Sequence, residues 1–485
     1  MWLFLKDNFW LLLLIINYVI AMFTAGFIVM NNRNPVKTLS FVLALIVLPF
    51  ISILIYYFFG QEYRKTKIFK RKHIFDHEKI KKWEKKLLLS ETELDKIERN
   101  FLDEKIKLVK LLQNNQNSPL TFRNEVEILL NGEKKFEMLR KDILNAKDHI
   151  HLEYYILNDD TIGSELIEML CKKCQEGVSV RVSYDYVGSI LTSKTVKKMK
   201  SMGIEVFPFM PVWFPNLTRK LNYRDHRKIV IIDGLIGYVG GINISEYYVN
   251  PNKFEVFWRD THLKITGHAV KTLQTQFLLN WDFVSAKKNE IQDNFFPKVD
   301  IKSTTAVQIA ASGPDTDWAN IMEAIFTAIT TAEDFVYLTT PYFIPNDEIL
   351  TALVLAARSG VEVKLIIPKN GDSWAAKYAT NSYIEELLES GVQVYHYCKG
   401  MIHAKTMVVD NIFSTVGTSN MDNRSFNINF EINALIFNKE ISRQMVEIFE
   451  ADIKDCDAID LDEWKERSFF EKVKESFCRL WAPLL

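Results

Sequence analysis

The chain is poor in cysteine, in net charge and in glycine-rich phosphate loops. Its 485 residues contain five cysteines, an odd number at scattered positions, which excludes a disulfide framework and fits a reducing compartment. The 60 Lys and Arg residues are balanced by 61 Asp and Glu residues, which disfavours a globally basic nucleic-acid-binding protein. No G-x-x-x-x-G-K-[ST] loop is present, so a P-loop nucleotide site is not expected.

The composition is that of a globular protein with one isolated C-x-x-C pair. The chain is 48% hydrophobic and 25% charged, which excludes a disordered or fibrous protein, and its length predicts two or three compact units. Cys171 and Cys174 form the pair, within a pattern typical of an amphipathic helix. Because no second pair completes a metal-binding set, we expect neither a zinc site nor a redox function there.

Two long uncharged stretches open the chain, at residues 8–32 and 38–61. A bilayer crossing takes about 20 residues, so they predict a transmembrane hairpin within residues 1–60, with helices at about 9–30 and 39–59. A cleaved signal peptide is the alternative for the first stretch, but an equally long second stretch follows at once. Basic residues are denser after the second stretch than between the two, which predicts that the bulk of the chain lies in the cytoplasm.

Basic and amphipathic segments flank the central part of the chain. Residues 61–118 predict a basic, helical connector beside the membrane, where each basic residue near an anionic leaflet gains about 1 kcal/mol of attraction. A solvated charged helix is the alternative. Residues 461–485 predict an amphipathic C-terminal tail, because apolar residues alternate with Lys472, Lys474 and Arg479 from Phe469 to Leu485, and this part is expected at the membrane surface.

The middle of the chain contains one unit twice. A strand, helix, strand pattern at residues 149–184 returns at residues 335–367. Matching glycines are separated by 183 residues (360 − 177) and 188 residues (391 − 203), and matching histidines by 177 (403 − 226). A repeat this long indicates duplicated domains rather than a solenoid. We predict α/β domains at residues 119–290 and 304–460, with a linker at 285–305.

Each copy carries the same polar motif. In each copy, Lys stands two residues after His, Asp stands seven residues after the same His, and Asn stands seventeen residues after it. Both copies have identical spacing. Because side chains of a strand alternate between its faces, His and Lys point the same way, so an imidazole and an ammonium converge on one spot. We expect the Asp to pair with and orient these basic groups, with turn formation as its alternative role. The motif residues are His226, Lys228, Asp233 and Asn243 in the first copy, and His403, Lys405, Asp410 and Asn420 in the second.

This set of groups suits the chemistry of a phosphodiester. Lysines and amides can neutralise the negative charge that repels a nucleophile, one imidazole can attack phosphorus, and the other can protonate the departing alcohol. Histidine has an unperturbed pKa of about 6.5, so both of its protonation states are reachable near neutrality. The sequence offers no metal-binding cage, and we expect no metal or other cofactor.

The motif H-x-K-x4-D with a downstream G-x-x-N resembles the signature of the phospholipase D superfamily. Further pieces, in order along nearly the whole chain, are similar to bacterial cardiolipin synthases. The resemblance implies two tandem phospholipase D-like α/β/α sandwich domains, related by a pseudo-twofold axis, whose motifs form one active site. The pieces are Asn-Arg-Asn-Pro35, Phe58-Phe-Gly60, Gly240-Gly-Ile-Asn243, Trp258-Arg-Asp-Thr-His262 and Pro483-Leu-Leu485.

The resemblance also implies a reaction. One histidine takes the phosphatidyl group of phosphatidylglycerol as a phosphohistidine and releases glycerol, and a second phosphatidylglycerol displaces it to form cardiolipin. The family favours His226 as nucleophile and His403 as acid and then base, but the residues themselves leave the two roles open.

The implied partners are phosphatidylglycerol, cardiolipin and anionic membrane lipids, with no nucleic acid. The implied location is the bacterial cell (inner) membrane, multi-pass, with the catalytic domains on the cytoplasmic side. The acyl preference, the identity of the second lipid and the oligomeric state stay open.

By resemblance, five residues are expected around the substrate, two of them the motif asparagines. Glu431, 28 residues after His403 (431 − 403), occupies the position of a carboxylate that holds a histidine ring, and Asp260 takes this role in the first copy at a spacing of 34 (260 − 226). A solvated acid at the end of a strand is the alternative for Asp260. Asn243, Asn420 and Thr418 complete the expected substrate-binding set.

Two departures from the family pattern and one apolar segment stand near the first motif. Asp225 precedes the motif where Asn is frequent, and we expect it to face away from the site, whereas Ser245-Glu246 stand where Gly-Asp is common. The segment Pro208–Leu221 is apolar and is expected either to contact acyl chains or to pack as an internal loop.

Other functions stay open at this point. The scaffold also fits a phospholipase D, a phosphatidylserine synthase or another phosphatidyltransferase, or a nuclease, although a nuclease needs no membrane spans. A catalytically inactive scaffold that binds anionic lipid is the alternative from a different class of protein, and two intact motifs argue against it.

Overall fold

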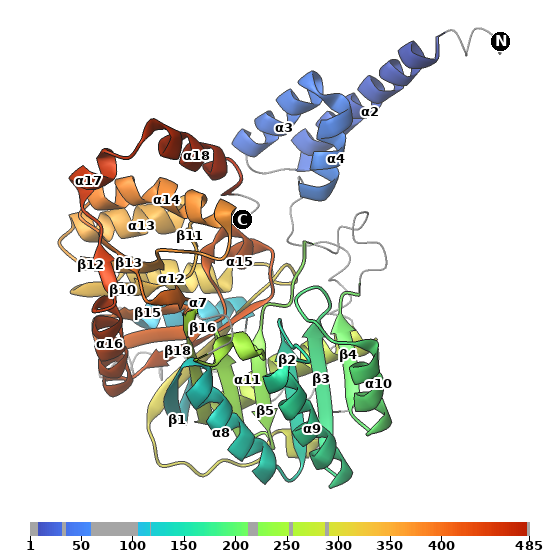
Figure 1. Ribbon diagram of the computed structural model, residues 1–485, viewed down its shortest axis with the longest axis vertical. Helices are drawn as coiled ribbons and strands as arrows, with labels where there is room; N and C mark the ends of the chain where they lie inside the picture. The colour runs from blue at the N-terminus through green and yellow to red at the C-terminus, as the bar shows by residue number, and fades with distance from the viewer. Residues whose placement is uncertain are drawn as a thin grey trace.

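A single mixed β-sheet runs through the body of the protein (Figure 1). The computed structural model describes residues 8–31, 35–59, 105–116, 118–211, 222–251, 256–286 and 291–482. Within these residues the sheet has 15 strands, in the order β19-β13-β12-β10-β15-β16-β18-β9-β1-β8-β6-β5-β2-β3-β4.

The strand order is nearly a palindrome about the antiparallel β1–β9 pair. Outward from this pair, the first half places β8, β6, β5, β2, β3 and β4, and the second half places the matching β18, β16, β15, β10, β12 and β13. β19 is added at the outer edge of the second half. The two tandem domains predicted from the repeat are therefore present and are related by a pseudo-twofold axis through the middle of the sheet.

The first half follows the predicted strand and helix pattern. Strands β2, β5 and β6 are almost fully buried because helices α8, α9 and α10 lie on one face of the sheet and α11 lies on the other. Cys171 is buried in α9, in agreement with a structural position. The elements are β1 (Thr121–Leu130), α8 (Asn131–Asn145), β2 (His149–Tyr154), α9 (Thr161–Gln175), β3 (Ser179–Asp185), α10 (Ser193–Ser201), β4 (Glu205–Phe209), β5 (Lys228–Ile232), β6 (Ile236–Gly240), η6 (Glu246–Tyr248), β7 (Phe257–Arg259), β8 (Thr261–Gly267) and α11 (Ala269–Ser285).

The second half repeats this layering. Helices α12, α13 and α14 cover one face of its strands, and α16 lies with α11 on the other face, where one apolar cluster joins both halves. The elements are η7 (Asp293–Phe295), β9 (Thr305–Ser312), α12 (Asn320–Thr330), β10 (Phe335–Thr339), β11 (Phe343–Ile344), α13 (Asp347–Arg358), β12 (Glu362–Pro368), α14 (Trp374–Glu389), β13 (Gln393–Tyr397), β14 (Gly400–Ile402), β15 (Thr406–Val409), β16 (Phe413–Gly417), β17 (Met421–Asp422), α15 (Asn423–Asn427), β18 (Glu431–Phe437), α16 (Lys439–Ile453), β19 (Cys456–Ala458), α17 (Leu461–Lys465) and α18 (Phe469–Arg479).

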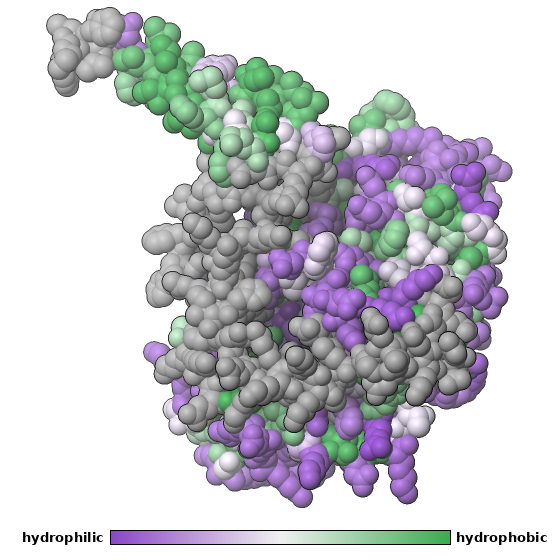
Figure 2. Space-filling view, turned by 180° about the vertical axis from the view of Figure 1, so that it is seen from behind, coloured by the Kyte–Doolittle hydropathy of each residue, from purple (hydrophilic) through white to green (hydrophobic). Residues whose placement is uncertain are grey.

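The N-terminal helices are apolar on all sides and project from the body of the protein (Figures 1 and 2). Helix α2 (Phe9–Asn31) contains a 22-residue apolar span, and it is the one helix in the described part of the chain that is long enough to cross a bilayer. The second predicted span is not one helix. It divides into α3 (Pro35–Val47) and α4 (Pro49–Phe59), because Pro49 lacks an amide hydrogen and its ring crowds the carbonyl of Leu45.

Part of the predicted connector belongs to the core of the second half. Helix α7 (Ile106–Gln116) buries an apolar face against α12, and Lys105 pairs with Asp410 at 2.9 Å. The Lys and Arg cluster predicted to lie at the membrane falls within residues 61–104, outside the described residues.

The motif aspartates lie at the far ends of their strands from the histidines. Asp233 follows Lys228 by five positions along β5, a distance of about 16 Å at 3.3 Å per residue. The Asp233 carboxylate accepts N–H groups of residues 147–149 at 2.8–3.2 Å, and that of Asp410 accepts those of residues 333–335 at 2.9–3.1 Å. Both residues have a positive φ, 54° and 52°. The expected pairing with the basic groups is therefore wrong, and the turn-forming role is correct, because each carboxylate satisfies backbone donors at the start of the neighbouring strand.

These contacts generate a prediction of stability. D410A removes a carboxylate from backbone donors and also leaves Lys105 as a buried, unpaired charge, so it should cost about 3–5 kcal/mol. D233A removes the same kind of backbone contacts without a lysine partner and should cost about 1–3 kcal/mol. Urea unfolding of the two full-length variants in detergent, followed by tryptophan fluorescence, measures the difference. Equal losses would contradict a special role for the Lys105 pair.

Candidate active site

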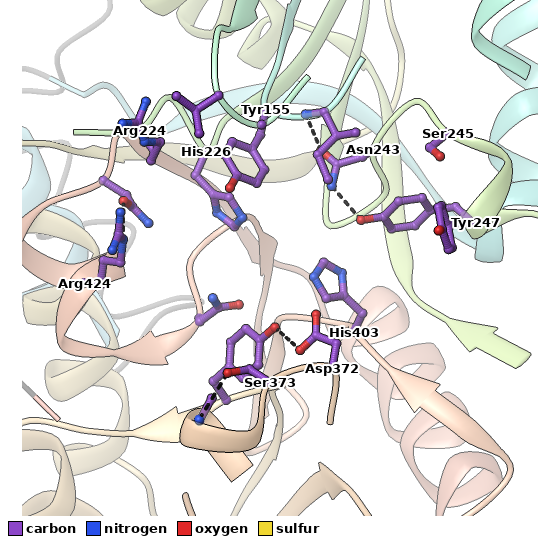
Figure 3. A pocket seen from close by; sticks show the side chains of 18 of the residues that line it. Tyr155, Arg224, His226, Asn243, Ser245, Tyr247, Asp372, Ser373, His403 and Arg424 are labelled. Carbon is purple, nitrogen blue, oxygen red and sulfur yellow. Dashed lines mark hydrogen bonds between the residues drawn. The ribbon is translucent and has the colours of Figure 1, made fainter. Parts of the chain in front are cut away.

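One cavity receives both motif histidines. It has a volume of about 840 Å³ and is lined by residues of both halves. His226 enters from the first half and His403 from the second, and Figure 3 shows the two imidazole rings directed into the same space. Asn243 and Asn420 line the cavity as well. The duplicated motifs therefore contribute to one site, as the resemblance to the phospholipase D superfamily implied.

Backbone pairing across the domain interface positions each histidine. Strand β14, which leads into His403, pairs in parallel with β7 of the first half, and the His403 N–H donates to the Arg259 carbonyl at 2.7 Å. In the same way, Asp225 forms a parallel bridge with Phe430, and the His226 N–H donates to the Phe430 carbonyl at 2.9 Å. Both histidines thus depend on the association of the two halves.

The carboxylates that hold the rings are exchanged between the halves. His226 Nδ1 lies 2.9 Å from Glu431, and His403 Nδ1 lies 2.7 Å from Asp260. The spacing along the chain counts each carboxylate from the histidine of its own copy and leaves open which ring it holds; in the structure each carboxylate holds the ring of the other copy. Within one half, a strand lies between the histidine strand and the carboxylate strand, so the two are about 10 Å apart, beyond hydrogen-bonding distance. The pairing across the interface brings the opposite partners together instead.

Glu431 is fully buried behind His226. Thr418 Oγ1 donates to its carboxylate at 2.5 Å, and Asn429 Nδ2 donates at 3.3 Å. Burial by itself would raise the pKa of Glu431, but His226, Lys228 and the Thr418 hydroxyl outweigh burial and hold this pKa below its usual value. The carboxylate is therefore ionised. Thr418 and Glu431 lie behind the ring and do not line the cavity, which corrects the expectation that they bind substrate directly.

Asp260 occupies the equivalent place behind His403. It accepts the Thr261 N–H at 2.7 Å and does not line the cavity, so it also orients a ring rather than contacting substrate. A Cβ at Gly241 would lie 2.1 Å from the Asp260 carboxylate. This close approach explains the second glycine of the first motif, because any side chain there would push Asp260 away from the imidazole.

The motif lysines are buried beneath the histidines. Lys228 Nζ donates to the His226 carbonyl at 2.7 Å, and Lys405 Nζ donates to the His403 carbonyl at 2.6 Å. Burial lowers the pKa of Lys228 to about 7, with Glu431 opposing this shift, and lowers that of Lys405 to about 8. Their charge therefore responds strongly to an anion in the cavity.

The histidines present their free nitrogen to the cavity. Because Nδ1 of each ring faces a carboxylate, Nδ1 carries the proton and Nε2 of the neutral ring keeps its lone pair. Burial lowers the pKa of His226 to about 4, against the attraction of Glu431, and burial with Lys405 lowers that of His403. Both imidazoles are neutral near pH 7 before substrate binds.

The two motif asparagines differ in their hydrogen bonds. Asn243 accepts the Ile156 N–H at 3.1 Å and donates to the Tyr248 hydroxyl at 2.6 Å. Asn420 Oδ1 is buried and has no hydrogen-bond partner among the described residues. Asn420 is therefore the asparagine with capacity left for a ligand.

The cavity also has charged residues that the sequence analysis missed. Arg224 and Arg424 lie on the side of His226, whereas Asp372 lies on the side of His403 (Figure 3). Asp372 accepts a hydrogen bond from Tyr342 at 2.5 Å, and burial raises the pKa of that hydroxyl, so it keeps its proton. Arg224 precedes His226 by two positions, so the alternation of side chains in an extended segment could have placed both on the same side. The sequence gives no signal that would place Asp372 near them.

Asp225 and the first residues of the apolar segment, Phe209 and Met210, do not line the cavity. Asp225 does not line it and accepts a hydrogen bond from Asn280 of α11 at 3.0 Å, so it faces away as predicted. Phe209 and Met210 of the apolar segment are buried in a small cluster with Phe430, which corrects the idea that they contact acyl chains. Residues 212–221 of that segment lie outside the described residues.

The family model "Cardiolipin synthase, PLD-like domain" matches residues 139–277 and 325–453. The chain is 39% identical over 469 residues to a cardiolipin synthase of Halalkalibacterium halodurans, covering 96% of this chain and 92% of the relative. It is 38% identical over 486 residues to one of Listeria monocytogenes, covering 98% of both chains. Among solved structures, phosphatidylserine synthase of Haemophilus influenzae superposes with a TM-score of 0.59 at 16% identity, over 78% of this chain and 100% of that chain, which shows a shared fold. The sequence matches and the paired motifs agree, and the chain belongs to the cardiolipin synthase family of the phospholipase D superfamily.

Proposed function

We propose that the chain joins two phosphatidylglycerol molecules into cardiolipin and glycerol by way of a phosphohistidine. As a member of its family the chain is a membrane-associated phosphatidyltransferase that acts on phospholipids. The observation that carries the finer proposal is the pair of imidazoles in one cavity, each oriented by a carboxylate of the other half.

In the first step, Nε2 of His226 attacks phosphorus and the bond from phosphorus to the glycerol oxygen breaks. The incoming phosphodiester is an anion, and it raises the pKa of the buried imidazoles and lysines near it. His403 is then protonated and gives its proton to the departing glycerol. Lys228 and Lys405, charged in the presence of the anion, stabilise the negative charge that builds up around phosphorus.

In the second step, neutral His403 removes the proton from a glycerol hydroxyl of a second phosphatidylglycerol. That oxygen attacks phosphorus, the bond from phosphorus to nitrogen breaks, and His226 is regenerated. One phosphodiester replaces another, so bond types are nearly unchanged and the residues mainly position two lipids and exclude water.

The uneven charge of the cavity supports a division of labour between its two sides. The guanidinium groups of Arg224 and Arg424, near His226, suit the phosphate of the donor lipid. Asp372 and the Tyr342 hydroxyl, on the side of His403, suit the glycerol hydroxyls of the acceptor. A carboxylate there would also disfavour a second phosphate close to phosphorus.

We also propose two membrane crossings with the catalytic part on the cytoplasmic side. Helix α2 packs against α3 and α4 through Ala21, Ile28, Leu45 and Tyr56, as expected if the bent second segment returns through the bilayer. The excess of Lys and Arg after residue 61 supports the cytoplasmic side of the bacterial cell membrane. The proposed units remain residues 1–60, 61–118, 119–290, 304–460 and 461–485.

The reaction predicts both a product and an adduct. Phosphatidylglycerol labelled in its phosphatidyl group should give labelled cardiolipin with the full chain in membranes. Rapid denaturation at alkaline pH, where phosphohistidine persists, should leave the label on the peptide that contains His226, and H226N should carry none. Label on the His403 peptide would reverse the two roles.

Other outcomes would contradict the proposed reaction. Phosphatidic acid as the sole product would indicate a phospholipase, and no activity would favour a lipid-binding scaffold. Turnover in both H226A and H403A would refute the mechanism.

The exchanged carboxylates predict which step each variant impairs. With phosphatidylglycerol, E431Q and D260N should each lose at least about 100-fold in rate, since each weakens one acid–base group. Phosphatidyl-p-nitrophenol has a leaving group that needs no proton, so the burst of p-nitrophenol in the first turnover should recover in D260N and stay slow in E431Q, while later turnovers stay slow in both variants because the second step still needs His403 as a base. Recovery in E431Q alone would mean either that each carboxylate serves the histidine of its own half or that His403 is the nucleophile, and the position of the label on the peptides separates these two cases.

The lowered pKa of His226 predicts a loss of stability in acid. Below about pH 6.5 the unfolded chain protonates this histidine, but the folded chain does so only near pH 4, so stability falls as pH drops between these values. The same sense applies to Glu431, whose lowered pKa makes its ionised form a source of stability that acid removes. Between pH 7 and pH 4 the wild type should lose about 3 kcal/mol more than H226N, measured by urea unfolding in detergent. An equal loss in both would show that His226 is not held neutral.

A further inference from the structure

Helix α18 exposes its apolar face and buries its polar one. Ser468 caps the helix by accepting the Glu471 N–H at 3.3 Å, so the helix start is well defined. Phe469 and Phe470 are each 75% exposed, and Phe477 is 54% exposed. The remaining exposed apolar side chains of this face are Val473, Leu480 and Trp481.

Polar and small side chains of α18 make the contacts with the protein. Glu475 is 3% exposed and pairs with Arg467 at 3.0 Å, while Arg479 lies 4.5 Å from the centre of the Tyr383 ring of α14. Cys478 is buried beside them. In water, an amphipathic helix normally does the opposite, because burying one phenylalanine side chain contributes about 1.5–3 kcal/mol. The exposed face therefore requires an apolar partner outside this chain's own core.

The exposed face continues toward the catalytic cavity. α18 packs on α14, and the first turn of α14 presents Trp374, which is 59% exposed, beside Ser373 and Ala376 of the cavity wall. On the opposite rim, Val187 and Ile190 line the cavity and are 49% and 70% exposed. The entrance thus has apolar side chains on both rims, and on the second half they lead toward α18.

The same face lies at the end of the molecule that carries the membrane helices. Figure 1 shows α18 at the end occupied by α3 and α4, and Figure 2 shows a second hydrophobic projection there, beside the apolar N-terminal helices. We propose that the apolar face of α18, together with Trp374, inserts into the surface of the bilayer that α2 enters. It would hold the entrance of the second half against the leaflet that supplies the lipid substrates.

The charge of the segment specifies the kind of contact. Residues 461–482 hold five basic and five acidic side chains, so attraction to anionic lipid is weak and the insertion is mainly hydrophobic. The basic residues are Lys465, Arg467, Lys472, Lys474 and Arg479, and the acidic ones are Asp462, Glu463, Glu466, Glu471 and Glu475.

A polarity-sensitive label tests the insertion without any measurement of activity. F470C and the control L144C, whose leucine is 53% exposed at the end of α8, are made in a C398S background and labelled with the same environment-sensitive dye. In the full chain reconstituted into phosphatidylglycerol vesicles, the label at 470 should shift to the blue and be quenched at least threefold more by lipid-attached quenchers than the label at 144. The difference should persist in high salt.

Three results would overturn the proposal. Equal exposure of both labels to a water-soluble quencher would mean that the face stays in water. Shielding at 470 from the aqueous quencher without quenching from lipid would indicate a protein partner, such as a second copy of the chain. Loss of the difference in high salt would indicate an electrostatic contact instead.

An activity measurement supplies an independent check on the role of the surface. The variant F470S/F477S should lose at least tenfold in turnover of phosphatidylglycerol in vesicles and little with a dispersed short-chain substrate, whereas L144S should lose little with either. Equal loss on both substrates would refute a role in access to the bilayer. The label readout remains valid even if the proposed reaction fails.

Discussion

Each cavity imidazole is held by a carboxylate that comes from the other half of the chain. His226 depends on Glu431 and His403 on Asp260, and the backbone segments that lead into these residues pair across the interface. Neither half by itself contains a complete pair of ring and carboxylate. Domain association is therefore a condition for a working site.

Burial sets the electrostatic state of this site. The environment that lowers the pKa of His226 also lowers the pKa values of Lys228 and Lys405 to about 7 and 8. A phosphodiester that enters brings the opposite charge and favours the protonated forms of all these groups. Substrate binding and proton uptake are thereby linked. His403, the general acid of the proposed reaction, becomes protonated when the anionic phosphodiester binds.

The membrane determines how the substrates reach the cavity. The apolar helix α2 places the chain at a bilayer, and the inverted face of α18 gives the second half a contact of its own with the same surface. Two attachments on different parts of the chain would restrict rotation of the catalytic part about its anchor. This restriction would keep the apolar rims of the cavity, such as Val187 and Trp374, directed at the leaflet.

The sequence by itself determined the repeated α/β unit, both motif histidines and the apolar N-terminus, because these depend on period, spacing and residue type, whereas the meeting of the two motifs in one site was implied by the family resemblance. It failed where contacts are long-range. The role of Asp233 depends on a neighbouring strand, and the partner of Glu431 depends on the interface between the halves. Pro49 shows the same limit locally, since hydropathy indicates a span without indicating where a helix breaks. Only the tertiary structure decided which carboxylate serves which imidazole, because that choice is made by strand order and by backbone pairing between residues 143 and 205 positions apart.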